Sequence, residues 1–186
     1  MRQISNTHTG TEKHNTSMSR ELYILRHAKS DWDSGAKQDS ERPLNKRGRK
    51  DAPRIGTWMR EHYLYPGVVL CSTAVRARET LEAVAQELEL QPERIQFMDD
   101  LYLANLGTLL RILRDIPAEH NSVMLVGHNP GLDDLVSFLS KTPIPLTESG
   151  KLMTTASLAH FKLPGEWKEL EGRGELVNIV RPADLE

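Results

Sequence analysis

The segment LYILRH, residues 22–27, holds four apolar residues that run without alternation into an arginine and a histidine. Two later segments have the same form, VVLC at residues 68–71 and VMLV at residues 123–126. Short apolar runs of this kind are typical of strands that are buried on both faces of a largely parallel sheet. The three runs therefore predict the centre of a parallel sheet.

Apolar residues between and after these runs recur every three to four positions, which predicts amphipathic helices over residues 44–63, 77–88, 109–113 and 132–139. Pro53 lies inside the first of these helices, so that helix is expected to be kinked there or to start later than Lys46. Two further strands, of the edge type, are expected at residues 157–161 and 175–180. Alternating strands and helices predict an α/β fold, namely a three-layer α/β/α sandwich with a mostly parallel central sheet.

The length and composition indicate one folded domain. The chain has 186 residues, of which 38% are hydrophobic and 27% charged, and this mixture can fill one core. We expect the domain to span residues 20–186, because residues 1–19 carry almost no apolar side chain and are expected to form a disordered tail. Met18 could equally be the start of the protein in place of Met1.

Charge and cysteine content exclude several classes of function. A net charge of −2 argues against nucleic-acid binding driven by bulk charge. The single cysteine, Cys71, can form neither an internal disulfide nor a cysteine-based zinc site. No apolar run approaches the roughly 20 residues of a membrane span, and the N-terminus lacks the apolar region of a secretory signal. We expect a cytoplasmic protein with neither nucleic acid nor membrane as a partner, and its oligomeric state stays open.

Basic side chains follow each of the three apolar runs. Arg26 and His27 follow the first, Arg76 the second and His128 the third. Ligands of open α/β sheets bind outside the carboxyl ends of the strands, so these four side chains are expected at one edge. Pro130 marks a helix start beside His128, and the positive end of a helix favours phosphate. The predicted ligand is therefore an anion.

Three segments, in order, carry a resemblance to a known family. LRHA at residues 25–28 resembles the Arg-His-Gly signature of the histidine phosphatase superfamily, which also contains the phosphoglycerate mutases; STAVRARET at 72–80 resembles its second block and VGHNPG at 126–131 its third. The segment DSERPLNKRG, residues 39–48, looks most like the SixA-type phosphohistidine phosphatases. Ala28 stands where the family has glycine. The resemblance implies a phosphatase with a phosphoglycerate mutase-like fold.

The resemblance also implies roles for the matching residues. His27 would be the nucleophile and would form a phosphohistidine intermediate that water hydrolyses. Arg26 and Arg76 would clamp phosphoryl oxygens, and His128 would donate to another oxygen. No metal ion or other cofactor is expected, since the arginines supply the positive charge.

The acid that would protonate the leaving group is harder to find. Asp99 and Asp100 fall in the region where mutase-like members carry a glutamate, and Asp100 is the closer match. Phosphohistidine has a labile P–N bond and depends less on a positioned acid than a phosphate monoester does. We therefore expect phosphohistidine of a protein as the substrate. The alternatives are a small-molecule phosphomonoesterase or mutase of the same superfamily, and a non-catalytic phosphate-binding module.

Overall fold

Six strands form one mixed sheet in the computed structural model, which describes residues 19–185. The strands are β1 (Arg20–Arg26), β2 (Val68–Ser72), β3 (Ile95–Met98), β4 (Ser122–Gly127), β5 (Leu158–Leu163) and β6 (Glu175–Val180), in the spatial order β3-β2-β4-β1-β5-β6. The first four in that order are mutually parallel, whereas β5 is antiparallel to both of its neighbours. The expected disordered tail lies outside the described residues except for Ser19.

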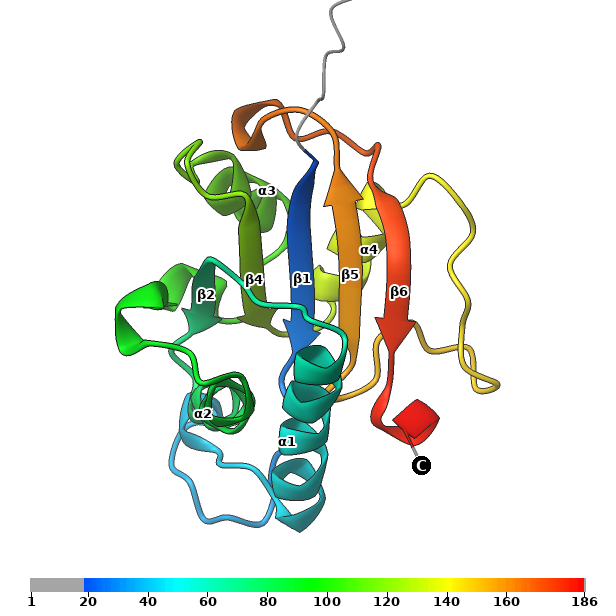
Figure 1. Cartoon of the computed structure of the whole chain (residues 1–186). Coiled ribbons are helices and arrows are strands. Elements are labelled where there is room, and N and C mark those ends of the chain that lie inside the picture. Colours follow the sequence, from blue (N-terminus) through cyan, green and yellow to red (C-terminus); the bar gives the residue numbers. More distant parts are fainter. Residues whose placement is uncertain (1–18, 186) are drawn as a thin grey trace, which may run out of the picture.

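Two helices cover each face of the sheet (Figure 1). Helices α1 (Lys46–Glu61) and α2 (Val75–Leu88) lie in front in that view, and α3 (Leu106–Arg114) and α4 (Gly131–Leu139) lie behind. The expected three-layer α/β/α sandwich with a mostly parallel sheet is thus confirmed. Within the described residues no helix is both long enough and apolar enough to cross a membrane.

The structure departs from the sequence analysis at three places. The segment expected at the sheet edge near residue 160 is β5, which lies between β1 and β6 and is largely buried. Strand β3 was not expected, because its four residues are only partly buried and show no apolar run. Helix α1 does not start later than Lys46, since the Asn45 side chain caps it by accepting a hydrogen bond from the backbone of Gly48. Pro53 lies within α1, where it lacks the N–H that would continue the ladder.

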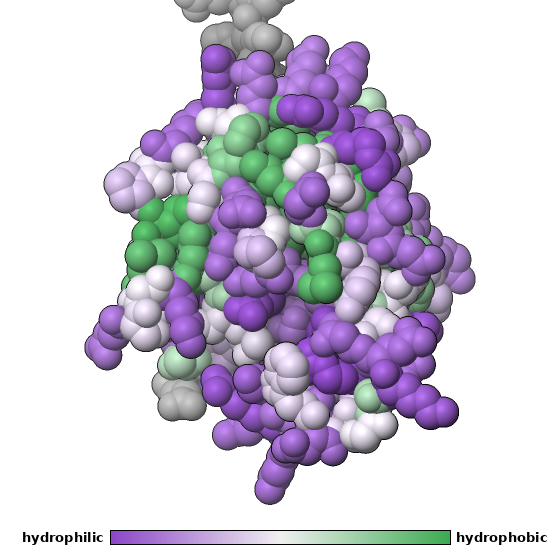
Figure 2. All heavy atoms as spheres, turned by 180° about the vertical axis from the view of Figure 1, so that it is seen from behind, coloured by the Kyte–Doolittle hydropathy of each residue, from purple (hydrophilic) through white to green (hydrophobic). Residues whose placement is uncertain are grey.

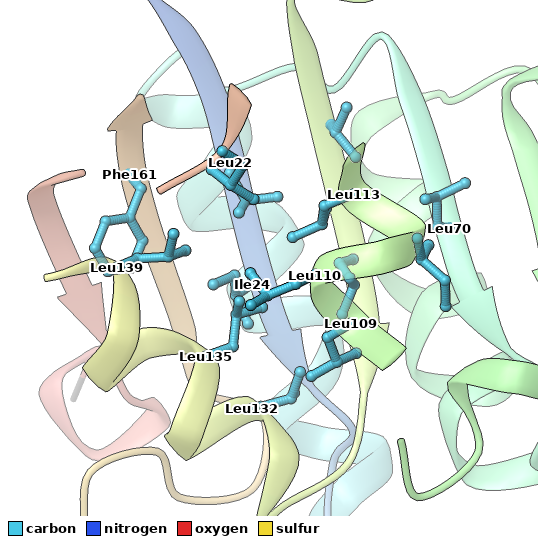
Figure 3. Packing of buried hydrophobic residues seen from close by; sticks show 14 of the residues in the cluster. Leu22, Ile24, Leu70, Leu109, Leu110, Leu113, Leu132, Leu135, Leu139 and Phe161 are labelled. Carbon is cyan, nitrogen blue, oxygen red and sulfur yellow. The ribbon is translucent and has the colours of Figure 1, made fainter. Parts of the chain in front are cut away.

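Side chains of β1 alternate between two hydrophobic clusters, as the pleat of a strand requires. Leu22 and Ile24 pack against α3 and α4, whereas Tyr23 and Leu25 pack against α1 and α2. Figure 3 shows the first cluster, in which leucines of α3 and α4 converge on Leu22, Ile24 and Phe161. The surface of the molecule on this side is mostly hydrophilic, with apolar patches between hydrophilic residues (Figure 2). Packing against both clusters fixes the central strand β1 from both faces of the sheet.

Gly48 lets α1 approach the chain just beyond β1. A Cβ built on Gly48 would overlap the backbone carbonyl oxygen of Lys29. Overpacking of this kind costs about 1–3 kcal/mol, so Gly48→Ala should lower the free energy of unfolding by that amount in urea titrations. Gly107→Ala is the matched control, because its added Cβ meets the Asn105 side chain at an ordinary 3.5 Å. Equal stability of the two variants would contradict the close approach of α1 to Lys29.

Candidate active site

The parallel pairing of β1 with β4 places His27 and His128 side by side. Arg26 is in register with Gly127, and the two histidines follow these strand ends directly. Their ring centroids are 5.0 Å apart. Arg76 comes from the first turn of α2, which follows the neighbouring strand β2. The structure therefore brings together residues that are far apart in the sequence, at the carboxyl edge of the sheet.

The His27 ring has a defined tautomer. It is 8% exposed, and its Nδ1 lies 2.8 Å from the backbone carbonyl oxygen of Ala28. A carbonyl oxygen can only accept, so Nδ1 carries the proton and donates it to that oxygen. The lone pair of the neutral ring is then on Nε2. Ala28 itself is fully buried with a negative φ, so its methyl group is accommodated at the position where the family has glycine.

Burial and neighbouring cations keep both imidazoles neutral near pH 7. Burial is the main cause that lowers the pKa of His27 to about 4; the guanidinium groups of Arg76, Arg26 and Arg42 also lower it, against the opposing hydrogen bond to Ala28. Burial likewise lowers the pKa of His128 to about 3, with contributions from His27 and Arg76. A neutral ring at His27 retains the lone pair that a nucleophile needs.

His128 is held by two neighbours that the sequence analysis did not identify. Its Nε2 lies 2.8 Å from the Oγ of Ser72, the fully buried last residue of β2. The ring of Tyr102 stands edge-on to the His128 ring, with centroids 5.4 Å apart. His128 is 2% exposed, so these contacts restrict its orientation.

The two predicted arginines are anchored through their terminal nitrogens. Arg26 Nη1 donates to the backbone carbonyl of Met153 at 2.6 Å. Arg76 donates from Nη1 to the backbone carbonyl of Asp39 at 2.6 Å and from Nη2 to its carboxylate at 2.8 Å. Within residues 19–185, the buried Nε of each arginine and the buried Nδ1 of His128 have no hydrogen-bond partner. Buried donors are normally satisfied, so the unpaired Nε–H groups of Arg26 and Arg76 are available to an acceptor such as an oxyanion.

Thr80 ties the His27 segment to α2. Its Oγ1 accepts a hydrogen bond from the backbone N–H of Ala28 at 2.9 Å and donates to the backbone carbonyl of Arg76 at 2.6 Å. Thr80 is fully buried. One side chain thus fixes the chain beside His27 relative to the helix that carries Arg76.

Asp100 lies away from these contacts. Its carboxylate is exposed and accepts a hydrogen bond from Arg111 of α3 at 2.8 Å. Asp99, the second candidate, accepts from the Thr73 hydroxyl at 2.6 Å. In the part of the chain that the structure describes, no hydrogen bond or ion pair joins Asp100 to His27, Arg76 or His128. Its role as an acid remains a prediction.

Asp39 is the main site neighbour that sequence reasoning missed. It belongs to a short 3-10 turn, η1 (Asp39–Glu41), in the connection between β1 and α1. A hydrogen bond from Tyr102, followed by those from Arg42 and Arg76, holds the pKa of the Asp39 carboxyl well below its usual range. In the sequence, residues 39–48 indicated only the resemblance to a family. Nothing in their spacing predicts the contact of Asp39 with Arg76, which lies 37 residues later.

The arrangement suits a phosphoryl group. Guanidinium groups match the geometry of phosphate oxygens and stay charged, while a neutral imidazole can attack phosphorus. No set of three or more His, Cys, Asp or Glu side chains is grouped as metal ligands among residues 19–185.

Comparison with known proteins agrees with this geometry. The sequence model of the histidine phosphatase superfamily (branch 1) matches residues 22–110. An uncharacterised chloroplastic protein of Arabidopsis thaliana is 31% identical over 171 residues, covering 84% of this chain and 78% of that protein. The phosphohistidine phosphatase SixA of Escherichia coli K12 is 28% identical over 145 residues, covering 77% of this chain and 85% of SixA.

A solved structure is also similar. The structure of the protein histidine phosphatase SixA complexed with tungstate superimposes with a TM-score of 0.75 at 26% identity, covering 89% of this chain and 99% of that one. The family match, the relatives and the fold point to the same group of enzymes. The chain belongs to the histidine phosphatase superfamily and is a phosphatase.

Proposed function

We propose that His27 is the nucleophile of this phosphatase. The Nε2 lone pair attacks phosphorus, the Nε2–P bond forms, and the bond from phosphorus to the leaving atom breaks with its electron pair on that atom. Water then attacks the phosphohistidine and releases inorganic phosphate. The observation that carries this proposal is the hydrogen bond from Nδ1 to the Ala28 carbonyl, which leaves the lone pair of a neutral ring on Nε2.

Three further side chains would stabilise the transferring group. Arg26, Arg76 and His128 surround His27, and each has a buried nitrogen without a partner among the described residues. We assign the arginine Nε–H groups to the phosphoryl oxygens, where charge gathers in the transition state, together with the Nδ1–H of His128 in the tautomer whose Nε2 accepts from the Ser72 hydroxyl. The solved SixA structure holds tungstate, an oxyanion of similar charge and shape, and this supports the assignment.

The proposed substrate is phosphohistidine of a protein. Asp39 is the carboxylate in contact with Arg76, and its low pKa makes it a poor proton donor at neutral pH. Asp100 is engaged by Arg111. An imidazole leaving group depends less on a positioned acid than the alkoxide of a monoester does. The SixA relatives are named for phosphohistidine or protein histidine phosphatase activity, which favours the same substrate class.

A substrate panel tests this proposal. The wild type should release phosphate faster from a histidine-phosphorylated phosphotransfer protein than from sugar phosphates, glycerate phosphates or an aryl phosphate, compared by kcat/KM. His27→Ala should lose about 10⁴-fold or more in turnover, because the covalent route is closed. His62→Ala is the control, since that exposed histidine stacks on Trp58 at the far end of α1.

Three outcomes of the panel would contradict the proposal. Monoester turnover well above phosphohistidine turnover would favour the small-molecule phosphomonoesterase alternative. Full activity of His27→Ala would refute the covalent route. Stoichiometric binding of phosphate without turnover would favour the non-catalytic phosphate-binding module.

The lowered pKa of His27 predicts its protonation state in acid. Because the pKa lies at about 4, the ring should still be neutral at pH 5, where a histidine of ordinary pKa near 6.5 is almost fully protonated. Two-bond ¹H–¹⁵N correlation spectra between pH 8 and pH 5 measure this, with His27→Ala used to assign the signal. As the pH drops below about 6.5, the unfolded chain binds a proton at His27, whereas the folded chain leaves this ring neutral until about pH 4. The free energy of unfolding therefore falls over this pH range. A His27 midpoint near pH 6.5 would contradict the account.

A further inference from the structure

Asp39 connects three side chains at the phosphoryl site. Its Oδ1 accepts from Arg42 Nε at 2.9 Å and Nη2 at 2.6 Å, and its Oδ2 accepts from Arg76 Nη2 at 2.8 Å and from the Tyr102 hydroxyl at 2.7 Å. A carboxylate offers about four lone-pair positions, so all of them are used. The backbone carbonyl of Asp39 accepts a further bond from Arg76 Nη1 at 2.6 Å.

Each partner of Asp39 acts on a residue of the site. The Arg76 guanidinium is one of the proposed phosphoryl clamps. Arg42 is close enough to lower the pKa of His27. The Tyr102 ring packs edge-on against His128. Asp39 therefore lies at the point where the β1–α1 connection, α2 and the segment after β3 meet around the two histidines.

The two bonds to Asp39 fix the plane of the Arg76 guanidinium. Each terminal nitrogen uses one of its two hydrogens on Asp39, which leaves one hydrogen on each and the N–H of Nε for a ligand. The arginine side chain is 3% exposed and Nε has no partner among the described residues. An arginine that is already oriented needs less rearrangement to reach the geometry of the transition state, so the gain appears in the rate of transfer.

We propose that Asp39 is a positioning residue for phosphoryl transfer, which orients Arg76 and Arg42 and offsets one of their positive charges. This inference rests on the proposed function of the His27 site. Asp39 acts through the arginines and does not touch the reacting atoms. Its full set of hydrogen bonds leaves no acceptor position for a substrate.

A positioning role predicts a split between catalysis and anion binding. Asp39→Asn removes one negative charge and places an NH₂ group against a guanidinium. The kcat should fall about 10–100-fold, because displaced catalytic groups cost rate steeply. The competitive inhibition constant of inorganic phosphate should stay unchanged or decrease, because the site becomes more positive.

Two variants complete the experiment. Tyr102→Phe keeps the charge and removes one of the four bonds to the carboxylate, so its kcat should fall a few-fold with phosphate inhibition unchanged. Glu171→Gln removes an exposed ion pair with Arg173 and should behave as the wild type in kcat and phosphate inhibition. Melting temperatures of all variants are measured in parallel. Should Asp39→Asn fail to fold, the kcat of Tyr102→Phe tests the positioning role: a few-fold fall supports it, and a wild-type kcat overturns it.

The proposal is overturned if Asp39→Asn folds and keeps the wild-type kcat, or if kcat and phosphate affinity fall together. The second result would mean that Asp39 only stabilises the β1–α1 connection beside the two histidines. An aryl phosphate serves as the substrate in these assays, alongside the phosphohistidine protein. The test of Asp39 therefore stands even when phosphohistidine proves not to be the substrate, and the two failures can be told apart.

Discussion

The pairing of β1 with β4 is the constraint on which the rest of the site depends. This register sets His27 next to His128 in a region where both rings are buried. Desolvation disfavours the imidazolium form and nearby guanidinium groups disfavour it further. The same burial that stabilises the sheet edge therefore yields a neutral ring with an available lone pair. The proposed mechanism needs an uncharged nucleophile beside guanidinium groups, and this packing arrangement is consistent with that requirement.

Concentrating cations at a buried edge has an electrostatic cost that the fold must offset. Asp39 supplies a carboxylate to Arg42 and Arg76 and binds Tyr102 as well. Met153 supplies a carbonyl to Arg26. At Arg26 and Arg76 these partners bind the terminal nitrogens and leave Nε unpaired among residues 19–185, so the two arginines are held in position and still have hydrogen-bonding capacity for an anion. Structural support and ligand binding are thus divided among different atoms of the same side chains.

Much of this arrangement could be predicted from the sequence. Unbroken apolar runs indicated β1, β2 and β4, and the rule that ligands bind at carboxyl strand ends grouped His27, Arg76 and His128. Strand β3 was not predicted from the sequence, because an edge strand of four half-exposed residues has no distinctive hydrophobic pattern. The roles of Asp39 and Tyr102 as neighbours of the site were not predicted, for another reason. Their contacts depend on how loops fold back over the sheet, and loop geometry at long sequence separation leaves no periodic signal.

The most direct test of the central claim is a crystal structure of the protein with orthovanadate, which adopts the five-coordinate geometry of a transferring phosphoryl group. We expect vanadium bonded to Nε2 of His27, with its oxygens accepting hydrogen bonds from Arg26, Arg76 and His128. Vanadate bound elsewhere, or a His27 ring that presents Nδ1 to the metal while Nε2 faces the backbone, would contradict it.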